Sequence, residues 1–417
     1  PVIDGKVLIS DVEGVTYLDV GLKNIADLRG IEAFTALEIF YCYENQLTSL
    51  DVSNNTALTE LDCYFSQLTN LDVSNNTSLR YLDCGENQLT SLNLSGNTAL
   101  STLFCDGNQL TNLDVSNNTS LTQLGCSSNQ LSSLDLSANT LLDGLYCTAN
   151  QLTSLDVSAN TALLLLNCHF NQLTSLDVSN NTALTELYCY VNQLTNLDVS
   201  GNTLLERLFC YENQLNSLNV ANGNNTNFTT LRATSNPNLT CIQVDDVAYS
   251  EANWTGGSFQ FDPQTSFSED CYVNIPDSNF EQILINLGID SNPVIDGKVL
   301  RSEVEGVTSL NVSSRNISDL TGIEAFTALE ELYCQFNQLT SLDLSSHSNL
   351  VLIDCADNQL NSLNVANGNN ENIIIFLARN NPDLTCVQVD DQAYSEANWN
   401  FGAKQFDPQT SFSEDCN

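Results

Sequence analysis

The apolar residues of this chain recur with a fixed period of 21 positions. Residues 58–73 read LTELDCYFSQLTNLDV, and the pattern of apolar and polar positions begins again at Leu79. Its cysteine returns nine times without a shift, from Cys42 to Cys210. Such a period is typical of repeat proteins, in which one coil cannot bury its apolar face and stacked coils share a continuous core. We therefore predict a β-rich solenoid of 21-residue coils, with a short strand at each L-x-C segment.

The polar residue three positions after each cysteine is nearly constant. It is serine at Ser66 and asparagine elsewhere, at Asn45, Asn87, Asn108, Asn129, Asn150, Asn171, Asn192 and Asn213. An inward asparagine can satisfy turn backbone groups of its own coil and of the adjacent coil, as buried backbone groups require. The whole pattern resembles the leucine-rich repeat, which implies parallel strands on a concave face and an irregular convex side.

The repeated cysteine takes the inward apolar position of the strand, where cysteine acts as a small hydrophobe. Identical side chains on adjacent parallel strands point the same way, which suits disulfide geometry poorly. We interpret this column as a buried ladder of thiols. The alternative is a metal or redox role, for which single cysteines at fixed spacing lack a local cluster of ligands.

The repeat rhythm divides the chain into two blocks. We predict a first solenoid over residues 1–271 with a loop-rich C-terminal cap at 233–271, and a second, shorter solenoid over 272–417 with a cap at 378–416. Each cap contains two cysteines 30 positions apart, which predicts the disulfides Cys241–Cys271 and Cys386–Cys416. Disulfides of this kind imply an oxidising, extracellular setting.

A helix is predicted over 275–288, at the start of the second block. Ser278 and Glu281 have the spacing of a capping box, and Gly288 is a stop signal. Four apolar side chains lie on one helical face, at Phe280, Ile283, Leu284 and Leu287. We expect this helix to close the N-terminal end of the second solenoid.

The charge balance narrows the range of partners. The chain has 11 Lys and Arg residues against 51 Asp and Glu, for a formal net charge of −40. Nucleic acids and anionic membranes need a basic surface, so neither is expected as a partner. No apolar run approaches the length of a membrane span, so no direct membrane insertion is expected.

Aromatic residues gather beside the ladder cysteines. The positions one before, one after and two after each cysteine are left free by the core, and 11 of these 27 positions are aromatic, at Tyr41, Tyr43, Tyr64, Phe65, Phe104, Tyr146, Phe170, Tyr188, Tyr190, Phe209 and Tyr211. Exposed aromatic clusters mark binding sites, so we predict that these residues form a ligand-binding face with interspersed acids. The alternative is strand propensity, which also favours Tyr and Phe.

Two other periodic features have a structural interpretation. An acidic column contains Asp51, Asp72, Asp114, Asp135, Asp156, Asp177 and Asp198, completed by Asn93 and Asn219. Each side chain is expected to cap its own turn, with divalent cation binding as the alternative. The repeated NNT, as at Asn54–Thr56, fits a glycosylation sequon, but its recurrence favours turn structure.

The repeat form NQLTSLDVSNNTALTELYC, residues 171–189, resembles the cysteine-ladder repeats of internalin-type bacterial surface proteins. The segments IPDSNFEQILINLGID (275–290) and NISDLTGIEAFTALEELYC (316–334) resemble secreted leucine-rich-repeat proteins of Bacteroidetes. The resemblance implies the fold, export and a binding role. It also implies a calcium loop, matched by Asp290, Asn292, Asp296 and Glu303. Two inserted residues within 293–295 disturb that match, and an acidic turn is the alternative.

We therefore expect a secreted or cell-surface binding module of the adhesin type, which holds a protein or glycan on an aromatic, acidic concave face and contacts neighbouring modules of the same chain. The alternative is a structural stalk or filament of tandem solenoids without a dedicated ligand. His169 and His347 belong to no nucleophile or metal motif. We expect no enzymatic activity, and no cofactor apart from calcium at the cap loop.

Overall fold

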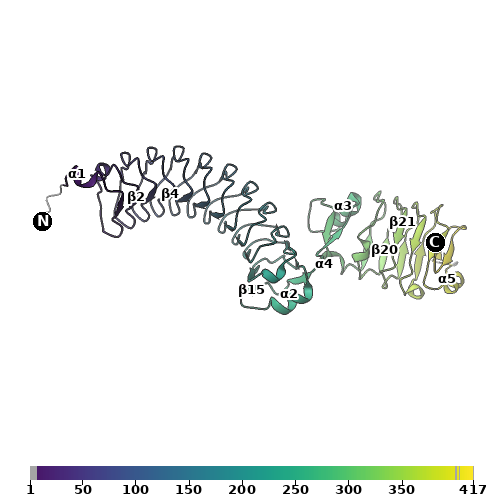
Figure 1. Cartoon of the computed structure of the whole chain (residues 1–417). Coiled ribbons are helices and arrows are strands. Elements are labelled where there is room, and N and C mark those ends of the chain that lie inside the picture. Colours follow the sequence, from purple (N-terminus) through teal and green to yellow (C-terminus); the bar gives the residue numbers. More distant parts are fainter. Residues whose placement is uncertain (1–6, 400–401, 403, 417) are drawn as a thin grey trace. The chain divides into compact units, whose positions relative to one another are not determined.

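The computed structural model describes residues 7–399, 402 and 404–416 of the 417-residue chain, so residues 400, 401 and 403 of the expected second cap lie outside the described residues. The chain divides into two compact units, Pro1–Glu269 and Asp270–Asn417 (Figure 1). Among the described residues, no helix is long and apolar enough to cross a membrane.

The first unit is built on a twelve-stranded parallel sheet. In Figure 1 its coils stack along a curve, with β2 and β4 on the inner, concave side. The residue of one coil pairs with the equivalent residue of the next, as Leu61 pairs with Leu82. In spatial order the strands are β1 (Tyr17–Asp19), β2 (Ile39–Tyr41), β3 (Glu60–Asp62), β4 (Tyr81–Asp83), β5 (Thr102–Phe104), β6 (Gln123–Gly125), β7 (Gly144–Tyr146), β8 (Leu165–Asn167), β9 (Glu186–Tyr188), β11 (Arg207–Phe209), β13 (Thr230–Arg232) and β15 (Phe259–Gln260).

Shorter elements complete this unit. A four-stranded parallel sheet contains β10 (Asn196–Asp198), β12 (Ser217–Asn219), β14 (Cys241–Gln243) and β16 (Ser266–Ser268). The helical segments are α1 (Ile9–Val12), η1 (Ile31–Ala33), η2 (Asn225–Asn227) and α2 (Val247–Asn253). Trp254, next to α2, is buried against Phe228, Phe259 and Phe267, so the C-terminal end of the core is covered by aromatic rings.

The predicted thiol ladder is confirmed. All nine ladder cysteines, from Cys42 to Cys210, are completely buried and free. Burial raises the pKa of these thiols, as it does at Cys63 and Cys147, so they are neutral. A neutral thiol behaves as a small apolar group, and the column joins the leucine columns in one continuous core.

The predicted asparagine ladder is also present. Asn87 Nδ2 donates to the carbonyl oxygens of Cys63 at 3.0 Å and Cys84 at 3.1 Å, while its Oδ1 accepts from the Leu68 amide at 3.0 Å. Each asparagine thereby joins its own coil to the preceding one. Ser66 interrupts this series, because its buried Oγ has no hydrogen-bond partner in the described structure.

A second asparagine ladder runs along the opposite side of the coils, at Asn55, Asn76, Asn97, Asn118, Asn139, Asn160, Asn181 and Asn202, all completely buried. Asn76 Nδ2, for example, donates to the carbonyl oxygens of Val52 at 3.0 Å and Asn55 at 2.8 Å. His347 takes the equivalent place in the second unit, where its Nε2 lies 2.8 Å from the Ile323 oxygen. The NNT segments predicted turns at these positions, and the structure shows that hydrogen bonds tie each turn to the preceding coil.

The second unit repeats the architecture on a smaller scale. Its five-stranded parallel sheet contains β19 (Ser309–Asn311), β20 (Glu331–Tyr333), β22 (Leu352–Asp354), β24 (Ile375–Leu377) and β26 (Lys404–Gln405), and a four-stranded sheet contains β21 (Ser341–Asp343), β23 (Ser362–Asn364), β25 (Cys386–Gln388) and β27 (Ser411–Ser413). An antiparallel pair precedes them, β17 (Tyr272–Asn274) with β18 (Lys298–Leu300). The helical segments are α3 (Ser278–Asn286), α4 (Arg301–Val304), η3 (Ile323–Ala325), η4 (Asn370–Asn372) and α5 (Gln392–Asn398).

Helix α3 lies inside the predicted range 275–288, but its capping was predicted wrongly. The N-cap is Asp277, whose Oδ1 accepts from the amides of Asn279 at 2.9 Å and Phe280 at 3.2 Å. Glu281 is completely buried and accepts instead from the amides of Asp296 and Gly297. These loop amides need an acceptor more than the helix terminus does, because Asp277 already satisfies the terminus. Leu287 was expected on the buried face and is 47% exposed.

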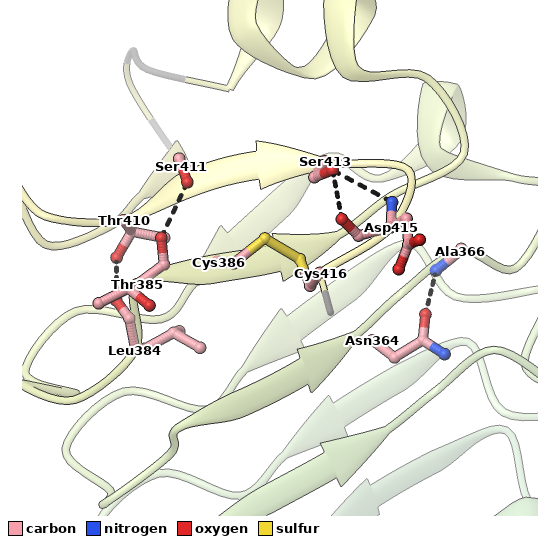
Figure 2. The surroundings of a disulfide bond; sticks show 10 residues. All are labelled: Asn364, Ala366, Leu384, Thr385, Cys386, Thr410, Ser411, Ser413, Asp415 and Cys416. Carbon is pink, nitrogen blue, oxygen red and sulfur yellow. Dashed lines mark hydrogen bonds between the residues drawn. A yellow bond between two sulfur atoms is a disulfide. The ribbon is translucent and has the colours of Figure 1, made fainter.

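Both predicted disulfides are confirmed. Cys386 at the start of β25 is bonded to Cys416, which follows β27, with their Cα atoms 5.8 Å apart (Figure 2). Hydrogen bonds reinforce this closure, because Thr410 Oγ1 donates to the Leu384 oxygen at 2.9 Å and Ser411 Oγ to the Thr385 oxygen at 2.9 Å. Cys241 and Cys271 are likewise disulfide-bonded.

Candidate binding surface

The local geometry of one coil decides which side chains face outward on the concave side. Each strand ends at the residue before the ladder cysteine, and its first and third residues face the same side because strand side chains alternate. The residue two after the cysteine has a positive φ, 52° at Phe65 and 52° at Phe170. Gly107 occupies this column once, with φ 63°. The concave surface therefore has strand columns, followed by a column in the left-handed turn.

The structure places the predicted aromatic residues on this surface, and none of the eleven is buried. Tyr64 is 37% exposed, Phe65 55% and Phe170 51%. The other eight are half-buried, namely Tyr41, Tyr43, Phe104, Tyr146, Tyr188, Tyr190, Phe209 and Tyr211. They do not form one uniform face: eight of them fall into two clusters with different surroundings, and Tyr41, Phe104 and Tyr146 lie outside both.

The first cluster, here called the acidic aromatic patch, lies over the N-terminal coils. It consists of Tyr43, Tyr64 and Phe65 together with Glu44, Asp62, Asp83, Glu86 and Asp106. The rings of Tyr64 and Phe65 are 5.9 Å apart. Burial and then the charges of Glu86, Asp83, Glu44 and Asp106 raise the pKa of the Tyr64 hydroxyl, so the negative field of the patch disfavours the phenolate.

Glycines make room for the side chains of this patch. A β-carbon at Gly85 would lie 3.2 Å from Tyr64 Cδ2 and 3.3 Å from Asp83 Oδ1. Burial raises the pKa of Asp83 to about 6, with smaller upward contributions from Asp62 and Asp106, although the Gly85 amide donates to its Oδ1 at 3.0 Å. The patch therefore holds carboxylates in an environment that disfavours their charged form.

The second cluster, here called the stacked aromatic patch, lies over the C-terminal coils and consists of His169, Phe170, Tyr188, Tyr190, Phe209 and Tyr211 with Arg207 and Arg232. The Tyr190 ring stacks on His169 with centroids 4.1 Å apart and on Tyr211 at 4.4 Å. Tyr188 stacks on Phe209 at 4.9 Å. The stacked rings of Tyr188, Tyr190 and Phe209 cover one another's faces, so they offer mainly edges and hydroxyl groups to a ligand. Phe170 contacts its neighbours edge-on and stays 51% exposed.

The stacked patch contains its own cations. Arg232 lies over the Phe209 ring, 5.5 Å from its centroid, and Arg207 Nη1 lies 3.6 Å from Glu186 Oε1. Burial lowers the pKa of His169, so its ring is neutral near pH 7. This patch therefore has cationic side chains among its rings.

Sequence reasoning missed the strand column three before the cysteine. Tyr17 packs edge-on against Tyr41, with centroids 5.9 Å apart, and Tyr81 packs edge-on against Phe104 at 6.3 Å. Arg207 belongs to the same column. The period-two alternation of a strand would have found these residues, since the positions three before and one before the cysteine share a face.

The acidic column has the predicted structural role. Asp72 Oδ1 accepts from the Ser74 amide at 2.9 Å, and Asn93 does the same for Ser95 at 3.1 Å. Bonds from the Ser74 hydroxyl and amide lower the pKa of Asp72. The NNT segments likewise form pinned turns, with Asn55 buried and Asn54 exposed.

The expected calcium loop is held together by internal hydrogen bonds. Asn292 Nδ2 donates to Asp296 Oδ2 at 3.1 Å, and Glu303 Oε1 accepts from the Ser291 amide at 3.3 Å. Asp290 is buried, and its Oδ2 has no hydrogen-bond partner in the described structure. No three acidic, histidine or cysteine side chains among the described residues are grouped to hold a metal. Calcium takes six to eight oxygens, so this loop would have to rearrange to bind the ion, and calcium binding stays a prediction.

The fold and the buried ladder define the class of this protein, a cysteine-ladder leucine-rich-repeat solenoid. Over 128 residues, 28% of the chain, it is 35% identical to Internalin J of Listeria monocytogenes, and the match spans 14% of that protein. The resemblance to internalin-type repeats is thereby confirmed; an origin in Bacteroidetes is not shown.

A solved structure supports the fold, and a second is similar in sequence. A leucine-rich-repeat protein of Leptospira interrogans is 17% identical, with 97% of each chain covered and a TM-score of 0.50. The cysteine-ladder functional domain of InlJ from Listeria monocytogenes is 28% identical, covering 92% of this chain and 70% of that chain with a TM-score of 0.49. No family model matches the chain.

Proposed function

We propose that this chain is an extracellular binding module that recognises a protein ligand through the concave face of its first unit. Its similarity to internalin repeats and the disulfide-closed ends of its solenoids support a place at the cell surface or outside the cell. The scaffold holds its outward side chains at fixed spacing, because two asparagine ladders join successive coils, as at Asn87 and Asn76, with Ser66 as the interruption of the first ladder.

The observation that carries this proposal is the conformation of Phe65 and Phe170. Both residues have a positive φ, which is unfavourable for a bulky L-residue by about 1 kcal/mol, and glycine fits the same column at Gly107. Both rings are also more than half exposed, so core burial does not compensate. Strand propensity cannot explain them either, because they lie after the strands. Phe336 repeats the combination in the second unit, with φ 59° and 59% exposure.

The proposal is tested with the purified chain on an array of immobilised extracellular proteins and glycans. The double substitution Phe65→Ser and Phe170→Ser should remove binding to the captured protein and leave the melting temperature unchanged. Leu141→Ser and Leu204→Ser form a matched control, because these exposed leucines, 54% and 51%, lie in the convex turns. Equal binding by all three proteins would favour the structural stalk instead.

A further inference from the structure

The acidic aromatic patch carries negative charge that the protein itself does not balance. Three ion pairs connect described residues, and they join Arg29 to Asp27, Arg207 to Glu186 and Arg301 to Asp270. None involves Glu44, Asp62, Asp83, Glu86 or Asp106. In the stacked patch, by contrast, Arg207 and Arg232 accompany the aromatic rings.

The rings of this patch are also available to a ligand. Phe65 and Tyr64 are 55% and 37% exposed, and the contact between them is tilted at 36° rather than face to face. An aromatic face attracts a cation within about 6 Å of its centroid, and guanidinium groups combine this contact with bidentate bonds to carboxylates. Glu44 and Glu86 occupy the same turn column as Phe65, one coil before and one coil after it. The Glu86 carboxylate lies beside Gly107 in the following coil, and a cation over Phe65 would draw it back towards the ring.

We propose that the acidic aromatic patch binds an arginine or lysine side chain presented by an extended, basic segment of a protein partner. This inference rests on the proposed function and names the chemistry of its ligand. The cationic group would lie between the Tyr64 and Phe65 rings and the carboxylates of Glu44, Asp83 and Glu86. A sulfated or phosphorylated glycan would be repelled by the same carboxylates.

The probe for this inference is a short acetylated oligo-arginine amide, with the matching citrulline peptide as a neutral isostere. Binding to the full chain is measured by fluorescence anisotropy at fixed ionic strength. The patch variant combines Glu44→Gln, Asp83→Asn and Glu86→Gln. The control variant combines Asp72→Asn, Asp114→Asn and Asp135→Asn, which removes the same number of charges from the turn-capping column, where Asn93 already serves.

The patch variant should lose about ten-fold in affinity for the arginine peptide, and the control variant less than about two-fold. Phe65→Ser, which changes no charge, should lose about three- to ten-fold. Equal losses in the two triple variants would overturn the inference, because they would show attraction by net charge alone. Citrulline binding as tight as arginine binding would also overturn it.

The two proposals fail in different ways. If Phe65→Ser and Phe170→Ser abolish capture of a protein ligand on the array while the patch charge variant binds it normally, the binding face stands and the cationic ligand is wrong. If both variants bind every captured protein as the unaltered chain does, the binding face itself is wrong.

Discussion

The two aromatic clusters of the first unit stand on the same sheet, yet they are organised in opposite ways. In the stacked patch, Tyr190 is held between His169 and Tyr211, and arginines accompany the rings. In the acidic patch, Tyr64 and Phe65 stay open among carboxylates without a partner in the described ion pairs. Similar sequence columns therefore produce one surface whose rings mostly stack on one another and one whose rings stand open among carboxylates.

The ladder beneath the two patches differs as well. Asn192, below the stacked patch, donates to the Cys168 oxygen at 3.2 Å and the Cys189 oxygen at 3.1 Å, and accepts from the Leu173 amide at 3.0 Å. Ser66, below the acidic patch, makes none of these bonds. The acidic aromatic patch therefore lies on a coil that lacks these hydrogen bonds to the preceding coil.

The largest change in stability should come from removing a ladder asparagine below the stacked aromatic patch, compared with removing the serine below the acidic aromatic patch. Asn192→Ala removes three buried hydrogen bonds and should lower the free energy of unfolding by about 3 kcal/mol. Ser66→Ala should change it by less than about 0.5 kcal/mol, because no bond is lost. Urea denaturation of both variants checks this pair, and equal losses would mean that Ser66 is bonded after all.

Completing the ladder should have the next largest effect. Ser66→Asn restores the residue that every other ladder coil carries, and we expect it to raise the free energy of unfolding by about 1–2 kcal/mol. Thermal and urea unfolding measure the gain. A destabilised variant would show that the Tyr64 and Phe65 coil has no room for the amide.

Removing a ring should distinguish the patches directly. Tyr190→Ser loses stacking on both faces and should cost about 1 kcal/mol of stability. Phe65→Ser should stay within about 0.5 kcal/mol, since the ring is exposed and its positive φ is unfavourable. The two melting curves settle the comparison, and a loss at Phe65 as large as at Tyr190 would contradict it.

The charge of the acidic patch should appear in the pH dependence of stability. The pKa of Asp83 is raised from 3.8 to about 6, so between these values the folded state binds more protons than the unfolded state. Stability is therefore lost as pH rises through this window. Asp83→Asn should add on the order of 1 kcal/mol above about pH 6, after allowance for solvent screening, and nothing below about pH 4.

Urea unfolding at both ends of that window tests the expectation. Asp72→Asn is the control of opposite sign, because bonds to Ser74 lower the pKa of Asp72. If Asp83→Asn raises the stability of the protein and lowers its affinity for the arginine peptide, the charge of Asp83 serves binding rather than folding.

The smallest effect concerns the loop that resembles a calcium site. A bound cation would need the loop to rearrange around the partnerless Asp290 Oδ2, so calcium should raise the melting temperature of the second unit by a few degrees at most. Asp290→Asn should abolish any such rise. Identical melting curves in calcium and in a chelator would exclude this site.

The sequence by itself determined the solenoid. Identical spacing favours equivalent contacts in successive coils, so one repeat predicts the burial of Cys63 and the bridging role of Asn87. The 30-residue spacing of the cysteines, which recurs in the two caps, predicts the closure by Cys386 and Cys416. The same apolar pattern recurs in each coil, and each core position packs against the equivalent position of the next coil, so the residue type there is constrained.

Only the tertiary structure decided how the outward residues combine. Tyr64 and Tyr190 occupy the same column, and their different surroundings depend on neighbours one coil away, Gly85 for the first and His169 with Tyr211 for the second. The bond between the Glu281 carboxylate and the Asp296 amide likewise depends on a loop 15 residues away in the chain. Surface side chains are not constrained by the repeat, so their stacking, burial and charge depend on contacts that sequence period alone does not contain.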